Sequence, residues 1–596
     1  MLESVWGPDA QAVIDGARAS GLTASPADWR DGWIYFLMVD RFNNPNKAIA
    51  SVPFDAPVTH YQGGSNAGVV AQLSYIKGLG AGAIWLSPVL RNVPSDQTYH
   101  GYGIQNFLVA EDRFAAGGRA TADQELRALV DAAHATGLYV IFDIVLNHTG
   151  DVFHYPGNQA QEGFQNDPLA ALEWRDQTGT ARADDPAIES IPSPSYDGFV
   201  WPSELQRNAA FRRQGMPLPG GDDTIGDFYS LKQLMTIDPD VQRTLIRAYQ
   251  YVIARFDVDG FRIDTLRYLK GDLACTFGNA MREFALEVGK KNFFTFGEVW
   301  SSDDDIARFI GHVAGDPSDL VGVDAALDYP LFYVLPPAAK GLIAPSAVAA
   351  MYQHRKSVEA NIISSHGDAT RYFVTFLDNH DQTSRFRYVE PGNEDAFDDQ
   401  VTLALASLLS LPGIPCVYYG TEQGLHGSGA VSECVREALW GGPGFDATIP
   451  FYQHLAQIAA LRSARPALRY GRFYFRPVSG TDSTTFGISP YAPGVLAFSR
   501  ILNDEEVVVV ANTANDPAGI ALKVIVDAQL NAPGASFGVL YSNISSAPPS
   551  PAVQLVSGAT VNEVDGSTSN GNVNAIAVTL GPLEIQILGR PLAVVS

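Results

Sequence analysis

Cysteine and positive charge are both scarce in this chain. Its 596 residues include only three cysteines, Cys275, Cys416 and Cys434, and none of them stands in a CxxC pattern. So few cysteines exclude a disulfide framework and a cysteine-rich metal centre. Lys and Arg number 40 against 65 Asp and Glu, which leaves a net charge of −25. A chain this acidic repels phosphate backbones and anionic lipids, so we expect neither nucleic acid nor a membrane as a partner.

Long hydrophobic runs are also absent. No stretch approaches the roughly 18 apolar residues of a membrane-spanning helix. Residues 1–15 have neither the basic nor the apolar region of a signal peptide. We therefore expect a cytoplasmic protein, with a secreted or periplasmic protein whose leader was removed before residue 1 as the alternative. Hydrophobic residues make up 46% of the chain and aromatic residues 11%, which indicates a large packed core and excludes disorder.

The chain carries eight short apolar runs separated by helix-like segments. Several runs are apolar almost throughout, as parallel strands covered on both faces require. Eight such strands with intervening helices predict an α/β fold, a (β/α)₈ TIM barrel. The runs span residues 33–39, 83–89, 138–146, 257–263, 292–297, 320–327, 371–377 and 414–419. Two of the intervening helices are expected over residues 124–136, opened by a capping box at 121–124 and ended by Gly137, and over residues 239–255.

Two regions interrupt the alternation of strand and helix. Residues 149–227 are rich in Gly, Pro, Asp and Gln and are too long for a bare loop, which predicts a small domain inserted after the third strand. After residue 470, short strand-like runs punctuated by Pro, Gly and Asn predict a C-terminal antiparallel β-sandwich. We therefore divide the chain into 1–148 (first part of the barrel), 149–227 (inserted domain), 228–470 (rest of the barrel) and 471–596 (sandwich).

Polar side chains gather where four of the runs end. The active site of a barrel enzyme lies at the carboxyl ends of its strands, so these residues are candidates for chemistry. Several charges on one rim are hard to explain by packing alone, because unpaired buried charges are costly. The third, fourth, fifth and seventh runs end in Asp143, Asn147 and His148, in Arg262 and Asp264, in Glu298, and in His380 and Asp381.

The residue types on this rim favour cleavage of a glycosidic bond. No P-loop, GxSxG elbow or HExxH motif is present, which argues against phosphate, serine-nucleophile and zinc-protease chemistry. Glycosidases use one ionised carboxylate and one carboxylic acid with a raised pKa. Arg262 lies two residues before Asp264, so both side chains should point into the barrel. That spacing favours an ionised Asp264 and a protonated Glu298.

Four segments resemble the signature regions of the alpha-amylase family of glycoside hydrolases. They are residues 143–148, 260–265, 297–300 and 376–381, in the family's order and each at a strand end. The resemblance extends from about Trp33 to Leu468. It implies that Asp264 is the nucleophile, Glu298 the general acid/base and Asp381 the stabiliser of the transition state. It also implies that Tyr102, Asp143, His148, Arg262 and His380 form the substrate-binding site.

The activity that the resemblance implies is retaining cleavage of α-glucosidic bonds. Thr265, after the nucleophile, resembles members that cut α-1,4 bonds, so maltooligosaccharides or α-glucans are the expected substrates, with transglycosylation as a possible outcome. The alternative is a glucosyltransferase or sugar isomerase that uses sucrose, maltose or an alcohol acceptor. A non-catalytic carbohydrate-binding relative is a minor alternative, because the complete carboxylate set favours an enzyme. The oligomeric state cannot be read from the sequence.

The calcium positions of the family are only partly kept. The chemistry needs no cofactor, but the resemblance implies a structural Ca²⁺ with Asn147 as a ligand. A second ligand position, usually Asp, is Gln233 here, which loses the negative charge that Ca²⁺ favours. A second calcium loop, residues 40–46, faces Gly63-Gly64-Ser65 where the family has Gly-Gly-Asp. These departures leave bound calcium an open question at this stage.

Overall fold

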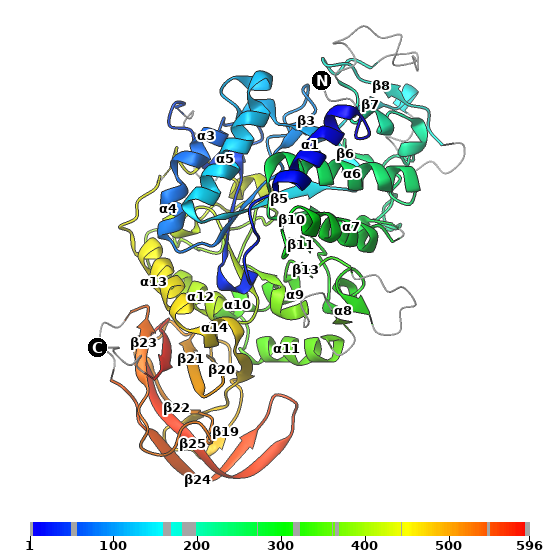
Figure 1. Ribbon diagram of the computed structural model, residues 1–596. Helices are drawn as coiled ribbons and strands as arrows, with labels where there is room; N and C mark the ends of the chain where they lie inside the picture. The colour runs from blue at the N-terminus through cyan, green and yellow to red at the C-terminus, as the bar shows by residue number, and fades with distance from the viewer. Residues whose placement is uncertain are drawn as a thin grey trace.

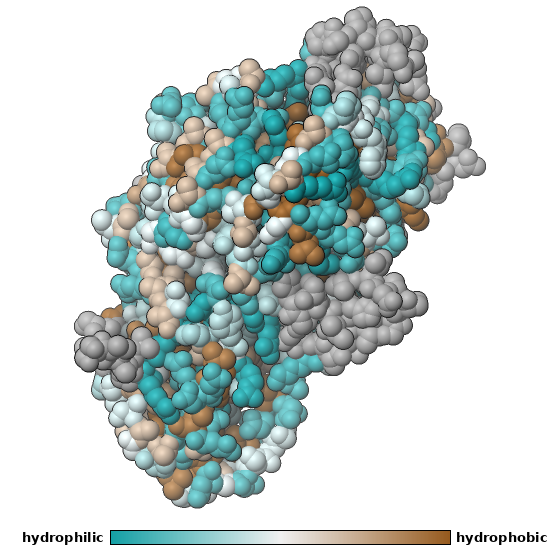
Figure 2. Space-filling model, viewed as in Figure 1, coloured by the Kyte–Doolittle hydropathy of each residue, from teal (hydrophilic) through white to brown (hydrophobic). Residues whose placement is uncertain are grey.

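A computed structural model describes most of the chain. The described residues are 4–48, 57–158, 169–181, 198–270, 272–313, 322–359, 362–363, 369–442, 444–544 and 549–590. Within them, no helix combines the length and the apolar character needed to cross a bilayer. Figure 2 shows hydrophilic residues spread over the visible face, with apolar residues between them in small groups.

The predicted barrel is confirmed. Eight parallel strands form one sheet in the order β13-β11-β10-β5-β2-β1-β16-β15, and a parallel bridge between Leu327 and Val374 joins the two end strands. Each strand overlaps one of the expected runs. The strands are β1 (Ile34–Leu37), β2 (Ala83–Leu86), β5 (Tyr139–Val145), β10 (Gly260–Asp264), β11 (Phe294–Gly297), β13 (Ala325–Ala326), β15 (Val374–Thr375) and β16 (Ile414–Tyr418).

Helices surround this sheet (Figure 1). They include α1 (Pro8–Ser20), α5 (Ala122–Thr136), α6 (Pro239–Phe256), α7 (Leu273–Glu287), α11 (Ser346–Glu359), α12 (Asp398–Ser410), α13 (Pro450–Ala464) and α14 (Pro466–Tyr470). The expected capping box at the start of α5 is wrong: the helix begins at Ala122, and the Thr121 hydroxyl donates to the side chain of Glu125 instead of capping a main-chain N–H. Gly137 ends α5 in the left-handed conformation, as predicted.

The fourth strand begins three residues later than the apolar run suggests. Asp257 takes a left-handed conformation, with φ of 62°, at the end of α6. Its carboxylate and that of Asp259 both bind the buried ammonium group of Lys290. The stretch before β10 therefore turns the chain from helix to strand, and the strand itself starts at Gly260.

The inserted segment after β5 has little regular structure among its described residues. Two short antiparallel pairs occur there: β6 (His148–Thr149) with β9 (Lys232–Gln233), and β7 (Phe153–His154) with β8 (Glu173–Trp174). Trp174 and Trp201 are both almost fully buried, and Trp174 stacks on Phe199 with ring centroids 5.4 Å apart. These tryptophans therefore belong to the packing of the segment.

The C-terminal region is a sandwich of two five-stranded sheets. Their orders are β17-β20-β21-β26-β23 and β18-β22-β25-β24-β19, antiparallel except that β19 pairs parallel with β24. The strands are β17 (Arg472–Phe475), β18 (Val478–Gly480), β19 (Thr485–Phe486), β20 (Val495–Leu502), β21 (Glu505–Asn512), β22 (Ile520–Ile525), β23 (Gly538–Ser542), β24 (Val553–Asn562), β25 (Thr568–Leu580) and β26 (Ile585–Gly589).

One buried arginine, Arg500, joins the sandwich to the barrel, which lies beside it (Figure 1), and a second, Arg462, joins helices within the barrel. Arg500 of β20 donates to the carbonyl of Ser410, the last residue of α12, at 2.7 Å and to that of Gly471 at 3.1 Å. Arg462 of α13 donates to the carbonyls of Leu409 and Leu468 at 2.8 and 2.9 Å. Both cations thus bind the carbonyl ends of helices, where the helix dipole favours positive charge.

Candidate active site

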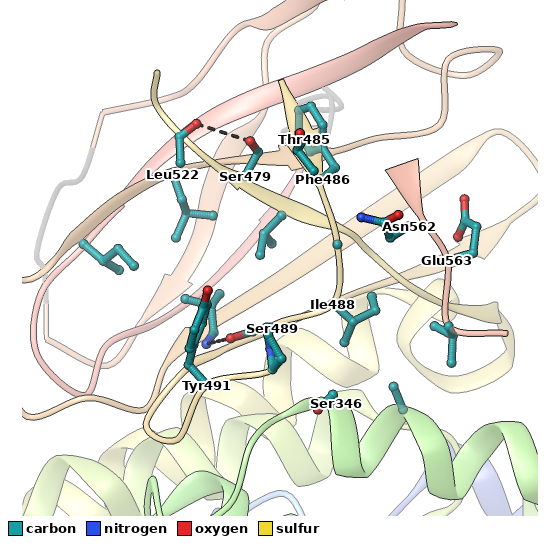
Figure 3. A pocket seen from close by; sticks show the side chains of 18 of the residues that line it. Ser346, Ser479, Thr485, Phe486, Ile488, Ser489, Tyr491, Leu522, Asn562 and Glu563 are labelled. Atoms are coloured by element: carbon teal, nitrogen blue, oxygen red, sulfur yellow. Dashed lines mark hydrogen bonds between the residues drawn. The ribbon is translucent and has the colours of Figure 1, made fainter. Parts of the chain in front are cut away.

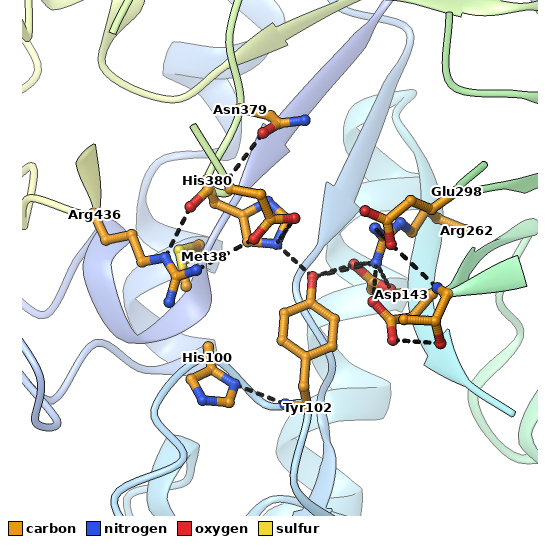
Figure 4. A network of polar contacts seen from close by, with 12 residues as sticks. Met38, His100, Tyr102, Asp143, Arg262, Glu298, Asn379, His380 and Arg436 are labelled. Carbon is orange, nitrogen blue, oxygen red and sulfur yellow. Dashed lines mark hydrogen bonds and ion pairs between the residues drawn. The ribbon is translucent and has the colours of Figure 1, made fainter. Parts of the chain in front are cut away.

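One guanidinium group holds three carboxylates at the carboxyl end of the barrel. The Arg262 Nη1 atom lies 2.8 Å from Asp143 and 3.0 Å from Asp264, and its Nη2 atom lies 2.7 Å from Glu298. The Arg262 side chain is 1% exposed, against 9% for Asp264 and 12% for Glu298. Figure 4 shows this group on one side of the Tyr102 hydroxyl. The guanidinium of Arg262 is thus fully buried, and Asp264 and Glu298 are only slightly more exposed.

The strand register brings these side chains together. Arg262 of β10 is directly opposite Asp143 of β5, and Ile263 is opposite Gly297, the residue before Glu298. Alternate residues of a strand point to the same face, so Arg262 and Asp264 both point inward. Three neighbouring strand ends thereby place their charges around one point, as the sequence predicted.

Aromatic side chains form the floor of this cluster. The Trp85 indole N–H donates to Asp143 at 3.2 Å, and the Tyr102 hydroxyl donates to the same carboxylate oxygen at 2.9 Å. Tyr102 also lies 2.6 Å from Nε2 of His380, and the two rings are nearly parallel with centroids 5.6 Å apart. Tyr102 therefore links the Arg262 group to the second half of the site (Figure 4).

That second half contains His380, Asp381 and an arginine that the sequence analysis missed. Asp381 lies 3.3 Å from Nε2 of His380, and its other oxygen is 3.2 Å from Nη2 of Arg436. Arg436 also donates to the His380 carbonyl at 2.9 Å and to the Tyr99 hydroxyl at 3.0 Å. Arg436 follows β16 in a segment without a strand-end pattern, so no sequence signal linked it to the site.

Arg436→Gln should lower kcat/KM, measured on a maltooligosaccharide as the substrate expected from the sequence, by on the order of 10²-fold. The reason is that Asp381 loses its charge-assisted hydrogen bond and is no longer held in one orientation. Arg436→Lys should recover part of that loss, with thermal unfolding measured alongside for both variants. Equal kcat/KM for Arg436→Gln and the wild type would show that Asp381 does not need this support.

His148 offers two ring nitrogens that no described residue satisfies. It is 2% exposed, and its Nε2 lies 4.0 Å from Asp264, beyond hydrogen-bonding distance. The Nδ1 atom of His380 is also without a partner among the described residues. Buried polar atoms are normally paired. Unpaired nitrogens beside three carboxylates are therefore suited to contact the hydroxyl groups of a ligand.

Burial keeps both histidines neutral near neutral pH. It lowers the pKa of His148 to about 4 and holds the pKa of His380 well below its usual range, where Arg436 and Arg262 depress it further. Burial also raises the pKa of Asp143 to about 7, against the opposing charge of Arg262. Two neutral imidazoles can each donate one hydrogen bond and accept another.

In the His148→Gln variant, the free energy of unfolding should fall less steeply as the pH is lowered below about 6.5. The unfolded chain binds a proton on His148 near pH 6.5 and the folded chain only near pH 4, so acidification between these values favours the unfolded state. Without the imidazole, the difference in bound protons between the unfolded and the folded chain is smaller by about one. Denaturant unfolding at pH 4.5, 5.5 and 6.5 measures it, and parallel profiles for variant and wild type would contradict the lowered pKa. Because the pKa of Asp143 is raised, its protonation favours the folded state as the pH falls. This contribution to stability is the same in the variant and in the wild type.

The geometry corrects one expectation about ionisation. Arg262 does not single out Asp264, because it binds Glu298 at a shorter distance, and Glu298 also accepts the main-chain N–H of Thr265 at 3.1 Å. Burial raises the pKa of Asp264, Arg262 lowers it, and the charges of Glu298 and Asp143 raise it again. Glu298 thus receives donors both from Arg262 and from the main chain of Thr265. The guanidinium reaches across two strands, which the spacing within one strand could not reveal.

One further contact at Glu298 comes from the segment after β13. The Tyr329 hydroxyl donates to the second oxygen of Glu298 at 3.3 Å. Tyr329 stacks on Trp300, with ring centroids 4.9 Å apart, and Trp300 is 40% exposed. An exposed indole beside a carboxylate is suited to pack against a sugar ring.

The contacts of Asn147 do not suit a bound calcium ion. Its Oδ1 atom accepts a hydrogen bond from the amide of Gln233 at 3.1 Å, so an N–H donor faces the oxygen that a cation would need. In the other expected loop, Asp40 is paired with Arg41 at 2.9 Å, and the Asn44 amide donates to the carbonyl of Gly63 at 2.7 Å. Within the described residues, no group of three or more His, Cys, Asp or Glu is placed to hold a metal.

A cavity of about 680 Å³ lies away from these carboxylates, between α11 and the sandwich (Figure 3). Ser346 lines it from the helix, and Phe486 and Tyr491 line it from the sandwich. None of the residues predicted for the active site lines it. The carboxylate cluster, and not this cavity, is therefore the candidate active site.

The family model described as alpha amylase, catalytic domain, matches residues 36–439. The alpha-amylase of Streptomyces lividans is 27% identical over 515 residues, which cover 77% of this chain and 52% of that protein. A cyclomaltodextrinase of Geobacillus thermopakistaniensis is 25% identical over 514 residues, which cover 83% of this chain and 71% of that protein. The chain thus spans about half the length of the Streptomyces relative.

Solved structures share the fold. The alpha-amylase of Geobacillus thermoleovorans, complexed with acarbose, has a TM-score of 0.62 and 24% identity, over 95% of this chain and all of that chain. A gamma-cyclodextrin glucanotransferase (CGTase) of Bacillus clarkii has a TM-score of 0.63 and 20% identity, over 96% of this chain and 71% of that chain. At these identities the likeness bears on architecture alone.

Proposed function

Because the chain belongs to the alpha-amylase family, we propose that it is a retaining glycoside hydrolase acting on α-1,4 bonds of maltooligosaccharides or related α-glucans. The observation that supports this most directly is the Arg262 guanidinium, which joins Asp264 and Glu298 beside the unpaired nitrogens of His148. Relatives named alpha-amylase and cyclomaltodextrinase support the substrate class.

The proposed reaction has two steps. A carboxylate oxygen of Asp264 attacks the anomeric carbon while the Glu298 carboxyl gives its proton to the departing glycosidic oxygen. The covalent glucosyl ester is then opened by water, which loses its proton to Glu298 as the bond to Asp264 breaks. Two inversions return the α-configuration. When a sugar hydroxyl replaces water in the second step, the product is a longer oligosaccharide.

The remaining side chains act on the charge and the position of the sugar. Asp381 supplies negative charge for the oxocarbenium-like transition state, and Arg436 orients it. His148 and His380 form hydrogen bonds with hydroxyl groups of the sugar at the cleavage point. Glu298 must exchange its contact with Arg262 for one with the glycosidic oxygen before it can donate a proton.

A substrate panel tests this proposal. Maltose, maltotriose, a cyclodextrin, isomaltose, sucrose and starch are incubated with the protein, and the products are separated by chromatography. Release of α-anomeric glucose or maltose from maltotriose, with isomaltose untouched, is the expected result. Rearranged disaccharides or longer sugars as main products would favour the glucosyltransferase or isomerase alternative. No change in any substrate would contradict the proposal.

A further inference from the structure

The segment that leads into α6 crosses the boundary between the inserted segment and the barrel. Its strand β9 pairs antiparallel with β6, so that Gln233 lies opposite His148 and Lys232 opposite Thr149. Gln233 is 2% exposed and Lys232 is 3% exposed. Two long polar side chains are therefore buried next to a residue of the candidate active site.

The orientation of the Gln233 amide is defined by its partners. Its Oε1 atom accepts the main-chain N–H of Gly226 at 2.7 Å, so its Nε2 atom must face the opposite side. There it donates to Oδ1 of Asn147 and to the carbonyl of Thr224, each at 3.1 Å. One NH₂ group thus draws together an oxygen from the loop after β5 and an oxygen from the end of the inserted segment.

The Lys232 ammonium group does the same for two carboxylates. It lies 3.3 Å from Asp151 and 3.7 Å from Asp227. The other oxygen of Asp151 binds Arg175 at 2.9 Å, and Asp227 also accepts the Tyr155 hydroxyl at 2.6 Å. Both acidic groups at this boundary are neutralised by fixed cations of the chain, which removes the ligands that a hard divalent cation prefers.

We propose that Lys232 and Gln233 replace a bound calcium ion as the link between the inserted segment and the barrel. We call these two residues the N–H clasp. A cation would attract the oxygens of Asn147 and Thr224 by charge, whereas Gln233 holds them by hydrogen bonds from its amide, and Lys232 pairs with Asp151 and Asp227. The clasp makes the boundary independent of calcium. Because the Gln233 amide holds Asn147, the residue before His148, it also positions that imidazole, and this second role alone rests on the proposed function.

Thermal unfolding of the purified protein tests the first role. The melting temperature of the wild type should be the same in EDTA and in millimolar CaCl₂ at matched ionic strength. Gln233→Asp replaces the donor with a third oxygen ligand beside Asn147 and Thr224. This variant should melt several degrees lower than the wild type in EDTA and recover with CaCl₂, but not with MgCl₂.

Two control variants separate the clasp from general effects of substitution. Gln233→Met removes the amide without adding a ligand, so its melting temperature should fall and stay low in calcium. Gln554→Asp, on an exposed position of β24, should behave like the wild type in both solutions. A wild type that itself melts lower in EDTA, or a Gln233→Asp variant that matches the wild type in EDTA, would overturn the proposal.

The second role has its own readout. Gln233→Met should lower kcat/KM for maltotriose about tenfold or more, mainly through KM, because a displaced His148 weakens its contacts with the sugar. An unchanged KM would overturn the positioning role. The melting experiments need no substrate, so a protein without glucosidase activity would contradict the proposed function and leave the calcium result to be judged by itself.

Discussion

Asp264→Asn is expected to lower kcat on maltotriose by at least about 10⁴-fold, with the fold unchanged. The amide keeps the size of the carboxylate but cannot attack the anomeric carbon. Asp264 accepts from Arg262 and from the Thr265 hydroxyl, both at 3.0 Å, and an amide oxygen can still accept one of them. The melting temperature should therefore change little. Initial rates and thermal unfolding of the same preparations measure both effects.

Glu298→Gln is the matched control for this result. It removes the proton donor but leaves the nucleophile, so a substrate with a leaving group that needs no proton, such as a glucosyl fluoride, can still react with Asp264. A glucosyl ester of the protein should then accumulate and appear in the intact mass. Near-full activity of either variant would refute the assigned roles. Adduct formation by Asp264→Asn would show that another residue is the nucleophile.

Arg262→Gln should lower the free energy of unfolding by about 3–5 kcal/mol at neutral pH. The substitution removes the one cation that Asp143, Asp264 and Glu298 share, and leaves buried carboxylates without a counter-charge. Burial already raises the pKa values of Asp143 and Asp264, and without Arg262 they rise further, so these two carboxylates bind protons more readily in the folded state. The loss of stability should therefore be smaller at pH 5 than at pH 8.

Denaturant unfolding at both pH values measures this difference. Arg243→Gln serves as the control, because that arginine is 69% exposed on α6 and its loss should change stability by less than about 0.5 kcal/mol. An Arg262→Gln variant with wild-type stability would mean that the three carboxylates are not charged together. An equal loss of stability at pH 5 and at pH 8 would contradict the expected uptake of protons by these carboxylates in the folded variant.

The barrel could be predicted because its strands are covered on both faces. All residues of β1, β2 and β10 are buried, so each strand appears in the sequence as an unbroken apolar run. The sandwich was harder to predict in detail. No apolar run marks β24, because most of its ten residues are at least partly exposed, and a register shift interrupts its pairing with β25. Polar residues on such a strand have no clear period of two.

The candidate site could be predicted where a strand end supplies the residue, and not elsewhere. Asp143, Arg262 and Glu298 follow from the rule that barrel sites lie at carboxyl ends. Arg436 reaches Asp381 and Tyr329 reaches Glu298 from connecting segments, and only the three-dimensional path of the chain brings them there. The sequence also could not show which carboxylates share Arg262, because these contacts join residues of neighbouring strands.

The joint between barrel and sandwich has a consequence for the conditions that the protein can withstand. Arg500 of the sandwich donates to main-chain carbonyls of Ser410 and Gly471, which never gain or lose a proton, so acid cannot discharge its acceptors. The link that Arg500 makes between the sandwich and the barrel should therefore persist at acid pH.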